Sequence, residues 1–187
     1  MARSAVDCDK MSVPRDREAS FGDIRSSIEA AVRYLSEHPE EARYTDSAAT
    51  AALEEGLRFR VTGPGSEDVS TDMPSSVGGG DSAPSPGWLF RAAVASCAGS
   101  LIAMEAGRAG VQPSGLEVTV DSESDDRGIL GLGSSVPAGP LSMRISVRLA
   151  ADAVDRSTLE ELVRRGVDRC PVADAVRRAV EVSVEVA

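Results

Sequence analysis

The sequence is short of aromatic residues, of histidine and of cysteine. Aromatic residues make up 3% of its 187 positions, so a core must be built from Val, Leu, Ile and Ala. His38 is the single histidine and there is no Cys-x-x-Cys pair, so we expect no metal and no cofactor. The start of the chain has no apolar run typical of a secretory signal, and three cysteines do not make a disulfide scaffold. We therefore expect a cytoplasmic protein.

An excess of basic charge is also missing. The formal net charge is -10 and the sequence pI is about 4.6. Such a surface repels phosphate groups, so we expect neither nucleic acid nor a membrane as partner. The longest apolar stretch, Trp88 to Met104, is interrupted by Arg91 and followed by Glu105. This pattern predicts a buried helix rather than a membrane span.

Three segments are predicted along the chain. Residues 1–20 show no periodicity and are interpreted as a loose leader. Apolar residues at helical spacing predict a helix from Asp23 that ends before Pro39, and a second short helix is expected at 46–55. We therefore predict a leader at 1–20, a helical extension at 21–56 and the main domain at 57–187.

The main domain contains alternating patterns and helical patterns in separate groups. Strands are predicted at 57–62, 116–120, 141–149 and 180–186, with a flexible glycine-rich loop at 66–85. A helix from Pro86 to about Gly107 is small and apolar on nearly every side, which predicts burial on several faces. Further helices are expected at 157–167, opened by a capping box that starts at Ser157, and from Pro171. Segregated strands and helices indicate an α+β fold.

Two of the cysteines are candidates for redox chemistry. Cys170 precedes Pro171 at a helix N-terminus, where free backbone N–H groups, the helix dipole and the neighbouring Arg169 favour a thiolate. Cys97 lies about three turns inside its helix and gains less from the dipole. A lone buried cysteine often serves as a small hydrophobic residue, so packing and redox pairing both remain open. Cys8 lies in the predicted leader and is a poor candidate.

The sequence around both cysteines resembles a known family. The segments that carry the resemblance are PSPGWLFRAAVASC at 84–97, DDRGILGL at 125–132 and RCPV at 169–172. They are similar to motifs of the OsmC/Ohr family of organic hydroperoxide resistance proteins, in the same order. The resemblance implies an OsmC-like fold: an intertwined homodimer whose sheets wrap two central buried helices. It also implies that Cys97 attacks an organic hydroperoxide, that Cys170 resolves the product as a disulfide, and that a small dithiol or thiol reduces it.

The sequence departs from the family pattern next to the second proline. Hydroperoxide-reducing members carry a Glu there that holds an activating Arg, whereas this chain has Gly87. The alternative function is therefore a non-catalytic OsmC-like dimer that binds a small ligand or senses oxidation. A third hypothesis is a structural α+β protein in which the cysteines only pack.

Overall fold

The computed structural model describes residues 21–178 and 180–186. The predicted leader, with Cys8, lies outside the described residues. The chain divides into two units, the first up to Trp88 and the second from Leu89 onward. Helices and strands are segregated along the chain, which confirms the predicted α+β class.

The first unit begins with α1 (Phe21–Glu37), followed by a short 3-10 helix, η2 (Pro39–Ala42). The predicted helix and its end before Pro39 are confirmed, because the residue before a proline avoids the helical region. Arg25 and Glu29 form an ion pair one turn apart at 2.9 Å. No residue of α1 is buried, so its apolar residues contribute little core to this unit.

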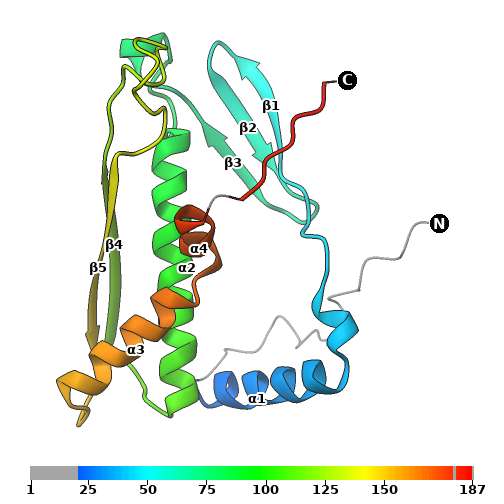
Figure 1. Ribbon diagram of the computed structural model, residues 1–187, viewed down its shortest axis with the longest axis vertical. Helices are drawn as coiled ribbons and strands as arrows, with labels where there is room; N and C mark the ends of the chain where they lie inside the picture. The colour runs from blue at the N-terminus through cyan, green and yellow to red at the C-terminus, as the bar shows by residue number, and fades with distance from the viewer. Residues whose placement is uncertain (1–20, 179, 187) are drawn as a thin grey trace. The chain divides into compact units, whose positions relative to one another are not determined.

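Three short strands form an antiparallel sheet in the order β1-β2-β3: β1 (Thr50–Glu55), β2 (Arg58–Thr62) and β3 (Asp68–Thr71) (Figure 1). The strand predicted at 57–62 is confirmed, but the helix predicted at 46–55 is wrong. Ala, Leu and Glu favour a helix locally, yet residues 50–55 pair with β2, with Ala51 opposite Val61. Pairing across the hairpin therefore overrides the local preference. The predicted domain boundary at 56/57 falls in the turn of this hairpin.

The glycine-rich segment is organised around one buried carboxylate. Asp72 accepts hydrogen bonds from the backbone N–H groups of Met73, Gly80 and Ser82 and from the Ser82 hydroxyl. A Cβ added at Gly79 would stand 1.8 Å from the carbonyl oxygen of Met73, so the chain needs glycine there for a close backbone approach. The prediction of a flexible loop at 66–85 is therefore wrong: the segment contains β3, η3 (Ser75–Val77) and this network.

The second unit is built on a long helix and a hairpin. The helix is α2 (Pro86–Ala109), whose first turn belongs to the first unit, and the strands are β4 (Gly115–Glu123) and β5 (Ser142–Ala150). The two strands pair without a bulge, with Val118 opposite Val147. Gly99 of α2 lies against Val118, because a Cβ there would be 3.6 Å from Val118 Cγ2. The helix lies alongside the hairpin (Figure 1).

Two shorter helices follow the hairpin. The first is α3 (Arg156–Asp168), and the second is α4 (Pro171–Arg177). The N-cap of α3 is Asp155, whose carboxylate accepts from the Thr158 backbone N–H at 2.9 Å, so the predicted cap at Ser157 is misplaced by two residues. The closing strand predicted at 180–186 is not formed within this single chain. These residues are exposed and form no strand in the described chain, because a strand needs a partner for its backbone groups.

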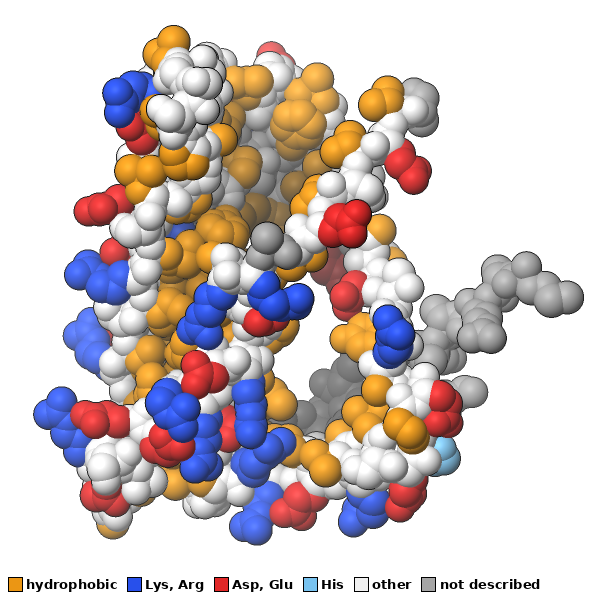
Figure 2. Space-filling view, viewed as in Figure 1, with side chains coloured by type: hydrophobic (Ala, Val, Ile, Leu, Met, Phe, Trp, Pro, Cys, Tyr) orange, Lys and Arg blue, Asp and Glu red, His pale blue; other side chains and the backbone are white. Residues whose placement is uncertain are grey.

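Only one stripe of α2 is buried: Val94, Ala98, Ile102, Glu105, Ala106 and Gly107. The sequence predicted that this helix is buried on several sides, but within one chain only one side of α2 is buried. Figure 2 shows hydrophobic side chains gathered over α2 and the strands beside it. By length and composition, α2 is long and apolar enough to cross a membrane, and 17% of its most apolar window is buried within the chain. The central helix of a soluble protein meets the same criterion.

Candidate functional site

Cys97 and Cys170 lie in the same part of the second unit. Cys97 is half-buried in α2, and Cys170 is fully buried at the N-cap of α4. Cys170 forms a buried cluster with Ala98 and Ala173, and Cys97 packs against this cluster. Both cysteines are free thiols. The structure thus brings together the two residues that the sequence singled out, although they are 73 positions apart.

The Cys170 thiol sits at the start of α4. The backbone N–H of Ala173 donates a hydrogen bond to Cys170 Sγ at 3.4 Å. Burial raises the pKa of Cys170, and the hydrogen bond and charge of Cys97 raise it further. The N–H groups of Ala173 and Val172 act in the opposite direction. The expectation that the helix N-terminus makes Cys170 acidic is therefore wrong, because desolvation of the thiolate outweighs the helix N–H groups.

A partly buried ion pair involves the residue next to Cys170, and sequence reasoning missed it. Glu105 of α2 is 4% exposed and accepts a hydrogen bond from Arg169 Nη1. Arg108 Nη1 lies 3.9 Å from the same carboxylate oxygen. Arg169 is the residue immediately before Cys170. The signal available in the sequence was an acidic residue placed inside an apolar helix, which must have a partner when buried.

The arginines near Cys97 in the sequence have other partners. Arg91 donates to Ser122 Oγ at 3.5 Å. In the first unit, Arg58 and Arg60 share Glu54, at 3.0 and 2.8 Å, and the two guanidinium groups lower the pKa of that carboxyl. Arg58 also donates to Ser82 Oγ at 2.6 Å. In the described chain, no hydrogen bond joins an arginine to Cys97 Sγ.

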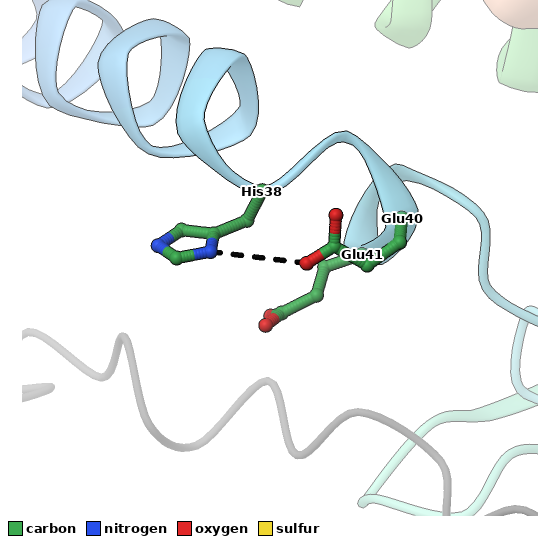
Figure 3. A group of neighbouring side chains, drawn as sticks. All are labelled: His38, Glu40 and Glu41. Carbon is green, nitrogen blue, oxygen red and sulfur yellow. Dashed lines mark ion pairs between the residues drawn. The ribbon is translucent and has the colours of Figure 1, made fainter.

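A candidate cation site follows the end of α1. His38, Glu40 and Glu41 place one ligand atom each within 4.8 Å of one another (Figure 3). His38 Nδ1 lies 3.8 Å from Glu40 Oε1. The Tyr34 hydroxyl donates to Glu41 Oε2 at 2.6 Å, so this carboxylate is already engaged. Exposed groups of this kind are common on protein surfaces, and the cluster is separate in sequence from both cysteines.

A cleft of about 780 Å³ lies between the β4–β5 hairpin and α3. Its apolar lining includes Leu116, Leu149 and Leu159, and charged residues such as Arg148 and Glu160 also line it. Neither cysteine is among the residues that line it. The cleft is therefore a feature of the second unit distinct from the thiol pair.

The chain is similar to a protein family and to individual members of that family. The family model for OsmC-like protein matches residues 78–185. An organic hydroperoxide resistance protein of Xanthomonas axonopodis pv. citri is 27% identical over 150 residues, which cover 80% of this chain and 98% of that protein.

Solved structures of the same group share the fold. An OsmC-like protein of Mycoplasma pneumoniae has a TM-score of 0.61 at 12% identity, over 72% of this chain and 89% of that one. An organic hydroperoxide resistance protein of Legionella pneumophila has a TM-score of 0.51 at 21% identity, over 71% of this chain and 90% of that one. The resemblance seen in the two cysteine motifs is confirmed, and the chain belongs to the OsmC-like protein family.

Proposed function

We propose that this chain is a thiol-dependent peroxidase that reduces organic hydroperoxides through Cys97 and Cys170. The observation that carries the proposal is the packing of Cys97 against the buried cluster that contains Cys170 in the same chain. The names of its relatives support a hydroperoxide as the substrate. The reductant would be a small dithiol or thiol.

The different exposure of the two thiols supports their order of reaction. Cys97 is half-buried, whereas Cys170 is fully buried, so a peroxide reaches Cys97 first. The Cys97 thiolate attacks the distal peroxide oxygen, the O–O bond breaks, and the leaving alkoxide takes a proton to become the alcohol. Cys97 is oxidised by two electrons to a sulfenic acid.

The second step joins the two sulfurs. The Cys170 thiolate attacks the Cys97 sulfur, the S–O bond breaks, and the leaving hydroxide takes a proton to become water. Formation of the sulfenic acid removes the negative charge of Cys97, which is one of the causes that raise the pKa of Cys170. Cys170 therefore ionises more readily once Cys97 has been oxidised. A dithiol then returns two electrons and restores both thiols.

A second candidate function is an OsmC-like protein that binds a small ligand or senses oxidation without turnover. Gly87 is exposed and stands where hydroperoxide-reducing members carry the activating Glu. In the described part of the chain, no arginine side chain forms a hydrogen bond with Cys97. Under this function, Cys97 would react once and slowly, and a ligand would alter the fluorescence of Trp88, the single tryptophan of the chain.

A turnover assay separates the two candidates. The substrates are cumene hydroperoxide and dihydrolipoamide, and the proteins are wild type, Cys97→Ser, Cys170→Ser and the control Cys8→Ser. Peroxidase function predicts turnover in wild type and Cys8→Ser and none in Cys97→Ser. Peptide mapping of the oxidised protein should find the Cys97–Cys170 disulfide with Cys8 free. Absence of turnover together with a saturable change in Trp88 fluorescence would support the binding function instead.

We further propose that the working form is a homodimer in a reducing compartment such as the cytoplasm. Free thiols persist under reducing conditions. One chain leaves much of α2 uncovered: Phe90 and Met104 are 36% and 39% exposed. Apolar surface of this kind is typical of residues that become covered in an obligate interface.

A further inference from the structure

The buried carboxylate of Glu105 has a specific place on α2. It lies on the same stripe as Ala98 and Ile102, the residues that contact the Cys170 region and α3. A buried carboxylate is costly without a partner. Glu105 obtains its partner from Arg169, whose side chain is 52% exposed while that of Glu105 is 5% exposed. The ion pair thus links a buried residue of α2 to the C-terminal end of α3.

Arg169 is coupled directly to the position of Cys170. It is the C-cap of α3, with its backbone N–H donating to the Arg165 carbonyl at 3.1 Å. The next residue, Cys170, donates its own N–H to the Val167 carbonyl at 3.3 Å and forms the N-cap of α4. One peptide unit therefore separates the residue held by Glu105 from the resolving thiol.

The Glu105–Arg169 pair is not placed to activate Cys97 directly. Glu105 follows Cys97 by eight residues on α2, which is about 12 Å along the helix axis. A carboxylate at that distance, neutralised by its ion pair with Arg169, has a small effect on the Cys97 thiol. The pair is instead placed to act through Cys170.

We propose that Glu105 and Arg169 are positioning residues that hold Cys170 against Cys97 and so set the rate of disulfide formation. The chemistry rests on the proposed function, since the step affected is the attack of Cys170 on oxidised Cys97. Attack of Cys97 on the peroxide does not depend on the pair. Misplacement of a reacting group by about 1 Å can slow a reaction by about 100-fold, so a small shift of the α3–α4 junction has a large effect on this step.

The experiment compares Glu105→Gln, Arg169→Gln and Arg169→Lys with the matched control Arg165→Gln. Arg165 lies one turn earlier on α3 and pairs with half-exposed Glu161 at 2.7 Å. Rapid mixing with cumene hydroperoxide gives the rate of sulfenic acid formation, read by dimedone trapping in a Cys170→Ser background. The rate of Cys97–Cys170 disulfide formation is read by mass spectrometry, together with the fraction of Cys97 oxidised to sulfinic acid.

Glu105→Gln and Arg169→Gln should slow disulfide formation by about tenfold or more, leave sulfenic acid formation within about twofold of wild type, and raise the sulfinic fraction. Arg169→Lys should recover part of the rate, because it retains the charge. Disulfide rates equal to that of Arg165→Gln would overturn the proposal. An equal fall in both steps would also overturn it, since that is the signature of a general structural loss.

A second readout tests the positioning role without any peroxidase activity. Diamide takes two electrons and two protons from a pair of thiols and leaves a disulfide. If wild type gives no sulfenic acid with peroxide, the proposed function fails, but the diamide rates still test the pair. Slower bridging of Cys97 to Cys170 in Glu105→Gln than in Arg165→Gln would support the positioning role, and equal rates would overturn it.

Discussion

Gly166 of α3 lies directly against the backbone of Ile102 in α2: a Cβ added at Gly166 would stand 2.6 Å from the Ile102 Cα. The neighbouring atom is backbone and does not move aside as a flexible side chain does. This close approach fixes the part of α3 that precedes Cys170. The crossing of the two helices is thus one determinant of where the Cys170 thiol lies.

Gly166→Ala is expected to destabilise the protein by about 1–3 kcal/mol, the cost of forcing extra atoms into a packed contact. The measurement is urea unfolding followed by circular dichroism. Gly139→Ala is the matched control, because a Cβ at Gly139 meets no atom within 4 Å. Equal unfolding midpoints for the two variants would contradict the close approach.

Asp72→Asn is expected to destabilise the loop that precedes α2 and to change the acid stability of the protein. Hydrogen bonds from Ser82, Gly80 and Met73 lower the pKa of Asp72 from 3.8 to about 2. A carboxyl whose folded pKa is depressed contributes stability above its unfolded pKa, and this contribution is lost as the pH falls towards 2. Thermal melts between pH 2 and 6 should therefore show a weaker pH dependence in Asp72→Asn than in wild type.

The control for this experiment is Asp126→Asn, because Asp126 is exposed and its side chain makes no hydrogen bond in the described chain. Asp126→Asn should keep the pH dependence of wild type. An Asp72→Asn profile parallel to that of wild type would show that the loop network does not hold the carboxylate in its charged form.

Cys97→Ala is expected to lower the pKa of Cys170 relative to wild type, measured by ultraviolet absorbance of the thiolate in a Cys8→Ser background. The hydrogen bond and the charge of Cys97 both raise the pKa of Cys170, and both are lost in this variant. Burial remains, so Cys170 should still titrate above its ordinary value of 9.0. Ser96→Ala, on the exposed side of α2, is the control and should leave the titration of Cys170 unchanged.

The same shift predicts the alkaline stability of wild type. A thiol whose folded pKa is raised contributes stability that is present below the unfolded pKa and lost as the pH rises through the folded value. The free energy of unfolding should therefore fall above about pH 9, with a smaller fall in Cys97→Ala. A fall in the free energy of unfolding that is larger in Cys97→Ala than in wild type would show that Cys97 does not raise the pKa of Cys170.

The double variant Val182→Asp/Val184→Asp is expected to weaken the proposed homodimer. These valines are 82% and 83% exposed and alternate with polar residues in a strand pattern that has no partner in the described chain. A second subunit would supply that partner at an open sheet edge. Light scattering over a concentration series should show a dimer for wild type and for Ser183→Asp, which adds a charge on the opposite side of the pattern. A wild-type monomer at micromolar concentration would contradict the dimer itself.

Most of the second unit could be predicted from the sequence. Alternating Val, Leu and Ile residues predicted β4 and β5, and the apolar run that begins at Pro86 predicted α2. These patterns are local, because the spacing of the apolar residues within each strand or helix indicates which of its faces is buried. The cysteine motifs likewise pointed to Cys97 and Cys170 without any knowledge of their separation in space.

Only the tertiary structure decided the rest. Residues 50–55 have helix-forming composition, but β2 offers hydrogen bonds that turn them into a strand. The helix N-terminus at Cys170 favours a thiolate in isolation, but packing under Cys97, Ala98 and Ala173 removes water and raises its pKa instead. Glu105 accepts a hydrogen bond from Arg169, which lies 64 residues later in the chain. In each case a contact between distant segments outweighs the local preference, because burial and pairing depend on partners that no short window of sequence contains.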